Sequence, residues 1–201
     1  MAKRTAPIER KTNEVDISGK LNIDGQGKSK INTGFKSLNH MLELFAFHGL
    51  FDLELQAKGD LEHHIVEDIG IALGGALKRA LGDAVGIKRY GNSFVPMDEV
   101  LANVVVDISG RPEMIFSASS DVWSEDLDLK PDDFKTFLKS FAEHAKITLN
   151  VSTKVSLGNF TRLDTHHVFE AVFKALGIAL DQATQIDPRR KGIPSTKGVI
   201  D

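Results

Sequence analysis

The chain contains the stretches HHIVEDIGIALGGAL at residues 63–77 and HHVFEAVFKALGIAL at residues 166–180. Both open on His-His-x-x-Glu and continue with apolar residues at helical spacing. Around them, residues 41–81 and 137–180 repeat one series: helix, histidine, strand, loop, motif, helix. Such a repeat indicates duplication of a two-layer α/β half. We therefore predict an α+β fold of two closely packed halves, residues 1–90 and residues 91–201. Whether they pack helix on helix or sheet on sheet stays open.

The other elements follow from hydrophobic periodicity and turn residues. Alternation predicts strands over residues 14–23, 51–57, 101–108, 113–118 and 147–151, and helical spacing predicts helices over residues 38–46, 65–81, 134–141 and 169–180. Asp24-Gly25 predicts a hairpin into residues 28–33, and residues 109–112 form a turn-like break between the first two strands of the second half. Residues 82–96 are expected to connect the two halves.

Composition excludes several classes of protein. The 201 residues are 41% hydrophobic, carry a net charge of −3 and include no cysteine, which excludes disulfide scaffolds, zinc ribbons and thiol nucleophiles. No apolar run approaches the length of a membrane span, and no signal peptide follows Met1. We expect a cytoplasmic protein that binds neither membrane nor nucleic acid, because a general basic surface is also missing.

The two His-His-x-x-Glu motifs hold four of the seven histidines. Adjacent histidines on a helix point about 100° apart, so one motif offers ligands in two directions and two motifs together could build two metal sites. Imidazole and carboxylate without thiolate suit Mn²⁺, Fe²⁺, Co²⁺ or Zn²⁺. For a single motif, a helix cap or a polar surface is the competing interpretation.

Two further features are candidates for the same site. His40, on the polar side of the first helix, is either another ligand or a structural residue. The tail, residues 188–198, is basic and rich in hydroxyl groups, glycine and proline, so it is either an anion-binding segment or a solvated end.

Together these residues are similar to one known family. The motif pair, the blocks Lys88-Arg89-Tyr90-Gly91 and Val95-Pro96-Met97-Asp98-Glu99, the turn at residues 109–112, the step Phe173-Lys174-Ala175 and the closing Pro194-Ser195-Thr196-Lys197-Gly198 resemble imidazoleglycerol-phosphate dehydratase. The resemblance runs from about residue 9 to residue 200. It identifies the chain as a divergent member of that family.

The resemblance implies a ribosomal protein S5 domain 2-like fold and a carbon–oxygen lyase (hydro-lyase) of histidine biosynthesis. The reaction removes water from imidazole glycerol phosphate and gives imidazole acetol phosphate. The family also implies two Mn²⁺ per active site at subunit contacts in a homo-oligomer of 24 subunits. The implied metal ligands are His40, His63, His64, Glu67, His166, His167 and Glu170. The implied contacts to substrate or phosphate are Glu14, Arg89, Arg111, Lys174, Ser195 and Lys197.

The implied mechanism follows from the weak acidity of the proton to be removed. That proton lies on a carbon next to the imidazole ring, and a ring held between two divalent cations takes up the developing charge. We expect Glu170 or Glu67 to move the proton and Glu14 to assist the leaving hydroxyl.

Several positions depart from the family. Asn150 stands where the family has a metal-ligand histidine, Asn39 replaces an aspartate and Leu44 a glutamine. The loop at residues 59–62 is shorter, and residues 151–165 are longer, than in the family. Three interpretations stay open: an active dehydratase, a structural or binding paralogue that has lost the chemistry, and a related metal-dependent lyase with another phosphorylated substrate.

Overall fold

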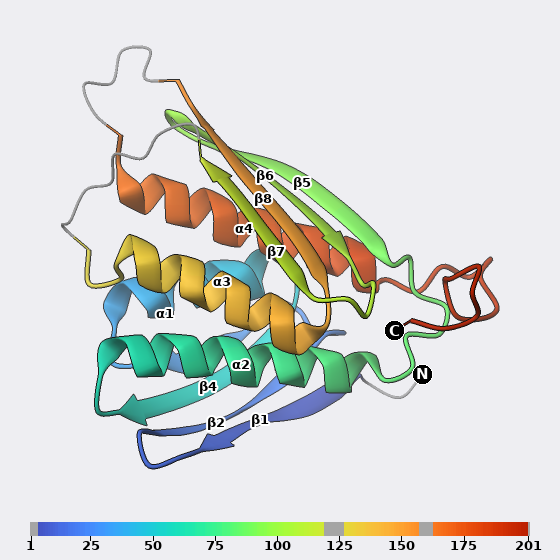
Figure 1. The fold of residues 1–201 in the computed structure, drawn as a ribbon, viewed down its shortest axis with the longest axis horizontal. Coiled ribbons are helices and arrows are strands. Elements are labelled where there is room, and N and C mark those ends of the chain that lie inside the picture. Colours follow the sequence, from blue (N-terminus) through green and yellow to red (C-terminus); the bar gives the residue numbers. More distant parts are fainter. Residues whose placement is uncertain (1–3, 119–126, 157–162, 201) are drawn as a thin grey trace.

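Two four-stranded sheets form the outer layers of the molecule, and four helices lie between them (Figure 1). These elements belong to residues 4–118, 127–156 and 163–200, which the computed structural model describes. The first half contains β1 (Thr5–Lys11), β2 (Val15–Asn22), β3 (Ser29–Asn32), α1 (Lys36–His48), β4 (Asp52–Gly59) and α2 (Glu62–Leu81). The second half contains β5 (Tyr90–Met97), β6 (Val100–Asp107), β7 (Glu113–Ala118), α3 (Pro131–Ala145), β8 (Thr148–Val155) and α4 (Thr165–Thr184).

The two halves have the same topology, which confirms the predicted duplicated α+β fold. The strand orders are β1-β2-β4-β3 and β5-β6-β8-β7. In each sheet the second strand is antiparallel to both of its neighbours, and the last pair is parallel. The halves pack helix on helix, with α2 against α3 and α1 against α4. The core therefore includes a double helical layer covered by a sheet on each side.

The expected first hairpin is wrong. β3 does not form a hairpin with β2; it pairs in parallel with β4, from Ser29 opposite Leu53 to Asn32 opposite Gln56. In the second half, β6 and β7 both pair with β8. Parallel neighbours need a crossover between them, and α1 and α3 are these crossovers. The turn residues after β2 and β6 therefore redirect the chain across the sheet.

The edge strands β1 and β5 were not predicted. β5 begins within the segment expected to be a connection, and it contains Gly91 and Pro96, residues that weaken a strand pattern. Gly91 is needed where it lies, because a Cβ there would collide with the carbonyl oxygen of Ala179 on α4. β5 thus packs closely against the helix that carries the second motif.

A glycine at the same position of each repeated stretch lets the helix pairs approach. Gly74 and Gly177 are both the twelfth residue of the stretches that begin at His63 and His166. A Cβ on Gly74 would collide with the carbonyl oxygen of Phe141 on α3, and one on Gly177 would lie 2.5 Å from that of Phe45 on α1. The duplication therefore preserved a backbone contact as well as a motif.

No helix in the described ranges is both long and apolar enough to cross a bilayer.

The four helices of the described chain all begin at one end of the molecule (Figure 1). Asp128, just before α3, accepts hydrogen bonds from the backbone N–H groups of Lys36 and Ser37 at the start of α1, at 2.8 and 3.0 Å. Lys130 lies 3.7 Å from Glu62 at the start of α2. We call this the motif end, because both histidine motifs lie there, and the opposite end, with residues 186–200, the tail end.

Candidate metal and phosphate site

The carboxylate of Glu170 lies at the centre of a cluster built by α1 and α4. Its Oε1 is 2.7 Å from Nε2 of His166 and 3.0 Å from Nε2 of His40. The two imidazole rings are stacked, with centroids 5.6 Å apart and planes 7° apart. The other oxygen, Oε2, accepts a hydrogen bond of 2.5 Å from Nζ of Lys174, one helical turn further along. The packing of α1 on α4 therefore brings His40 to the second motif.

The chemistry of this cluster suits a divalent cation. Burial raises the pKa of Glu170, but the hydrogen bonds from Lys174 and His40 outweigh burial and lower the pKa to about 2. The carboxylate is therefore ionised at neutral pH. One ligand atom each from His40, His166 and Glu170 lie within 4.8 Å of one another. Two imidazoles and one carboxylate fit Mn²⁺, Fe²⁺, Co²⁺ or Zn²⁺ and leave further coordination positions for other ligands.

His167, the second histidine of the motif, points to other carboxylates. Its Nδ1 is 3.0 Å from Oε2 of Glu99, in the turn between β5 and β6. The other oxygen of Glu99 accepts the backbone N–H of Asp164 at 2.8 Å. Burial raises the pKa of Glu99, but these two hydrogen bonds hold it below its usual value. Burial lowers the pKa of His167, and the contact with Glu99 outweighs burial and raises it.

The first motif, at the start of α2, is more exposed. Nδ1 of His64 is 2.8 Å from Oδ1 of Asp60 and 3.9 Å from Oε2 of Glu14. The rings of His63 and His64 are in contact, with centroids 4.2 Å apart. The side chains of His63 and Glu67 are exposed. Among the described residues, the three-ligand clusters include the second motif and not the first. One chain therefore does not unite the two motifs in one site.

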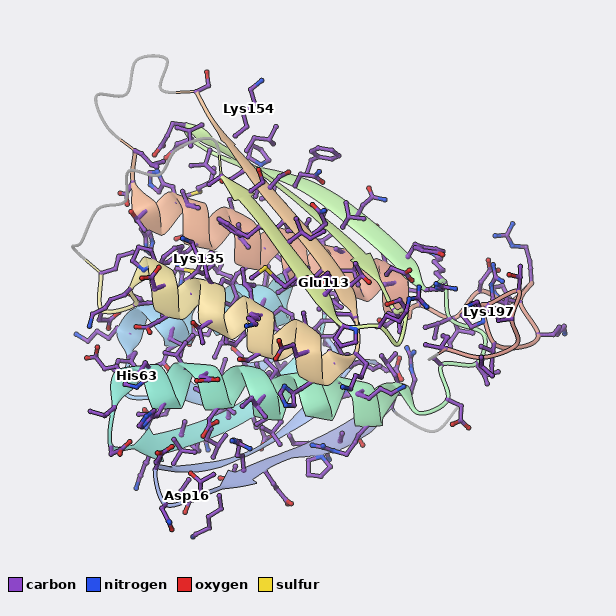
Figure 2. The ribbon with its side chains drawn as sticks, in the orientation of Figure 1. Asp16, His63, Glu113, Lys135, Lys154 and Lys197 are labelled. Atoms are coloured by element: carbon purple, nitrogen blue, oxygen red, sulfur yellow. The ribbon has the colours of Figure 1, made fainter. Side chains whose placement is uncertain are left out.

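The expected phosphate contacts lie at the tail end. The backbone N–H of Arg89 donates a hydrogen bond to the carbonyl oxygen of Ala183 near the end of α4. Its guanidinium binds Asp107 at 2.6 and 3.1 Å and the carbonyl oxygen of Pro194 at 3.0 Å. Arg111 follows Gly110, whose N–H binds the carbonyl oxygen of Lys146 at the end of α3. Figure 2 shows Lys197 at the end opposite His63.

The length of α4 sets the separation between these groups. The helix has 20 residues, and at 1.5 Å per residue it spans about 30 Å from the second motif to the tail end. Of the expected substrate contacts, only Lys174 lies in the cluster of Glu170, and Glu14 lies at the first motif. Arg89, Arg111, Ser195 and Lys197 therefore cannot meet the histidines of their own chain around one small molecule.

The part of the chain that contains both histidine motifs matches a known family of proteins. The sequence profile of imidazoleglycerol-phosphate dehydratase matches residues 33–180, more than half of the chain, including both motifs. The chain belongs to this family. The dehydratase of Geobacillus kaustophilus is 51% identical over 98% of this chain and 99% of its own, and that of Syntrophobacter fumaroxidans is 47% identical over 98% of each.

Solved dehydratase structures have the same fold. The enzyme from Pyrococcus furiosus superimposes with a TM-score of 0.79 at 34% identity, over 94% of this chain and 98% of its own. The enzyme from Staphylococcus aureus gives 0.78 at 37% identity, over 91% of this chain and 99% of its own. Members of the dehydratase family are hydro-lyases of histidine biosynthesis. The comparisons therefore favour an active dehydratase over a structural paralogue or a lyase with another substrate.

The expected divergence from the dehydratase family is wrong for the chain as a whole, since about half of its residues are identical to those of relatives over their full length. The local departures are nevertheless placed by the structure. Asn150 lies on the exposed face of β8, opposite Val105 and Ile115, and not beside Glu170. Asn39 binds Thr33 through its side-chain oxygen, at 2.8 Å from both the backbone nitrogen and Oγ1. The longer segment before the second motif includes residues 157–162, which lie outside the described residues.

Three acidic residues at the motif end were not predicted: Asp60, Asp98 and Glu99. Each contacts the second histidine of a motif, with Oδ2 of Asp98 3.7 Å from Nε2 of His167. The sequence did contain a signal, because Asp98 and Glu99 belong to a block similar to the dehydratase family and Asp60 precedes His64 by one helical turn. Spacing alone does not indicate that a turn between two strands reaches the start of α4.

Proposed function

We propose that the chain catalyses the dehydration of imidazole glycerol phosphate to imidazole acetol phosphate in the cytoplasm. The observation that carries the proposal is the position of Glu170, an ionised and nearly buried carboxylate between two imidazoles and the ammonium of Lys174. Family membership supplies the reaction, and this cluster supplies a chemical reason for it. The substrate is a small phosphorylated imidazole, and neither nucleic acid nor membrane is a partner.

The residues that would hold metal are the histidines and glutamates of the two motifs together with His40. We propose Mn²⁺, with two ions in each complete site, and the proposed ligands are His40, His63, His64, Glu67, His166, His167 and Glu170. Bound divalent ions supply charge stabilisation for the imidazole ring as it loses a proton. Asn150 occupies the sequence position at which the resemblance expects another ligand, on the exposed face of β8, and an amide oxygen is a weaker ligand than imidazole.

The carboxylates at the motif end differ in how firmly they are held and how exposed they are. Both oxygens of Glu170 are held, one by His40 and His166 and the other by Lys174, which suits an anionic ligand. Glu67 is exposed one turn from His63, and Glu14 lies 3.9 Å from His64, so both are accessible at the first motif. We assign removal of the proton to Glu67 and assistance to the leaving hydroxyl to Glu14. Lys174 holds Glu170 in place and faces the same cluster.

The active site is shared between subunits. The first motif of one subunit and the second motif of a neighbour supply the metal ligands, and the tail end of a further subunit supplies Arg89, Arg111, Ser195 and Lys197 for the phosphate. This arrangement is supported by the roughly 30 Å that α4 puts between the two groups in one chain. It requires a homo-oligomer, for which 24 subunits is the size implied by the family.

A dehydration assay together with a count of bound Mn²⁺ tests the proposal. We expect Mn²⁺-loaded protein to form the acetol phosphate, and Glu170→Gln to lose more than about 100-fold in turnover because a central anionic ligand is lost. Glu143→Gln, an exposed residue of α3, is the matched control and should keep full activity. Mn²⁺-loaded wild-type protein without turnover would instead support the structural paralogue, and full activity of Glu170→Gln would refute the role of the cluster.

A further inference from the structure

The second histidine of each motif is held in the same way by a carboxylate from outside the motif. Nδ1 of His64 is 2.8 Å from Oδ1 of Asp60, and Nδ1 of His167 is 3.0 Å from Oε2 of Glu99. The carboxylates come from different places: Asp60 precedes α2, whereas Glu99 reaches α4 from the turn between β5 and β6. The same contact between Nδ1 and a carboxylate is therefore made in both motifs by residues from different parts of the fold.

The first histidine of the second motif differs in the atom it uses. His166 faces Glu170 through Nε2, as His40 does, so these contacts join atoms that would bind the same ion. The contacts of His64 and His167 with Asp60 and Glu99 use the ring nitrogen on the opposite side. Only in this second type does the contact leave Nε2 available to a metal.

The chemistry of the acceptor fixes the position of the ring proton. Ionised aspartate and glutamate only accept hydrogen bonds, so Nδ1 must carry the hydrogen and Nε2 of the neutral ring must carry the lone pair. For His167, Nε2 lies 3.7 Å from Asp98 and 3.9 Å from Asp164, beyond hydrogen-bond distance from both. Ligand nitrogen atoms oriented by a carboxylate on the other ring nitrogen are typical of metal sites.

We propose that Asp60 and Glu99 are positioning residues, which accept the Nδ1–H of His64 and His167 and present Nε2 of each ring to a divalent cation. The inference rests on the proposed function, because it needs the two histidines to be ligands. It adds two residues outside the His-His-x-x-Glu motifs and gives each a defined action on one ring.

The two carboxylates differ in how safely they can be removed. The side chain of Glu99 is 1% exposed and also binds the N–H of Asp164, so its loss weakens the turn before α4. The side chain of Asp60 is 53% exposed, and its removal tests the proposal without opening the core. Asp132, 98% exposed at the start of α3, offers a control with the same change of charge.

The experiment measures Mn²⁺ affinity directly, from the signal of free Mn²⁺ in electron paramagnetic resonance titrations of wild-type protein, Asp60→Ala, Asp60→Glu and Asp132→Ala. We expect Asp60→Ala to weaken one class of Mn²⁺ sites by about 10–100-fold, Asp60→Glu to recover most of the affinity, and Asp132→Ala to match the wild type. Glu99→Gln, examined at a temperature where circular dichroism shows it folded, should weaken Mn²⁺ binding to a similar extent.

Unchanged Mn²⁺ affinity in Asp60→Ala, with normal binding by the wild type, would overturn this inference and leave the proposed function standing. Equal losses in Asp60→Ala and Asp132→Ala would also overturn it, because the effect would then be one of overall charge. A wild-type protein that binds no Mn²⁺ would refute the metal part of the proposed function and this inference with it.

Discussion

Mixing two inactive variants should restore activity if each active site is shared between subunits. His63→Ala removes an exposed histidine at the motif end, and Lys197→Ala removes an exposed lysine at the tail end, so both variants should fold. Because α4 alone separates the two ends by about 30 Å, the motif end and the tail end of one chain belong to two different active sites. A hybrid oligomer then contains some sites with an intact motif and an intact tail.

The size of the effect follows from random assembly. With equal amounts of the two chains, half of the motif ends and half of the tail ends are intact, so about one quarter of shared sites are complete. The variants would be co-expressed with different affinity tags, hybrids isolated on both tags, and turnover per subunit measured against the wild type. We expect about one quarter of wild-type turnover. Turnover no higher than the mean of the two separate variants would refute the shared site, since every single-chain site would carry one lesion.

Three further perturbations test the fold, the charge of the cluster and the outer sheet. Gly177→Ala should lower the free energy of unfolding by about 1–3 kcal/mol in urea, because the new Cβ meets α1, whereas Gly192→Ala has open space and should change little; equal stability of the two would contradict the helix contact. The pKa of Glu170 is lowered from 4.5 to about 2, so its ionised form stabilises the folded state above pH 4.5, and that stability is lost as the pH falls toward 2. The thermal unfolding midpoint of metal-free wild type should therefore fall further than that of Glu170→Gln between about pH 6 and about pH 3. Equal decreases would refute the claim that ionised Glu170 stabilises the folded state. Asn150→His should raise Mn²⁺ affinity in titrations of the assembled protein, while unchanged affinity would show that the outer face of β8 lies away from the site.

The duplication and the helices were predictable because they depend on local periodicity. The motif and the apolar spacing recur within each stretch, and α1 and α2 end at Gly49 and Gly82, the first glycines after the helical pattern. Strand pairing was not predictable in the same way. A turn such as Asp24-Gly25 fixes a change of direction, but the partner of β3 is decided by the crossover through α1 and by burial of the sheet face.

Only part of the candidate site could be predicted from the sequence, because its contacts depend on tertiary packing. His40 and Glu170 are 130 residues apart, and only the packing of α1 on α4 brings them to 3.0 Å. The resemblance supplied that pairing, whereas residue spacing did not. The contacts of Asp60 and Glu99 depend on where two loops end, and the distance between the motif and tail ends depends on the whole architecture.

The common start of the four helices has an electrostatic consequence. In a bundle of alternating helices the macrodipoles largely cancel, but here they add, with partial positive charge at the motif end and partial negative charge at the tail end. Asp128 accepts hydrogen bonds from the first N–H groups of α1, and its charge has the sign that this field favours. By themselves these fields favour a contact between the motif end of one copy and the tail end of another over a contact between like ends. Such contacts are heterologous, and they produce closed rings when the rotation between subunits closes.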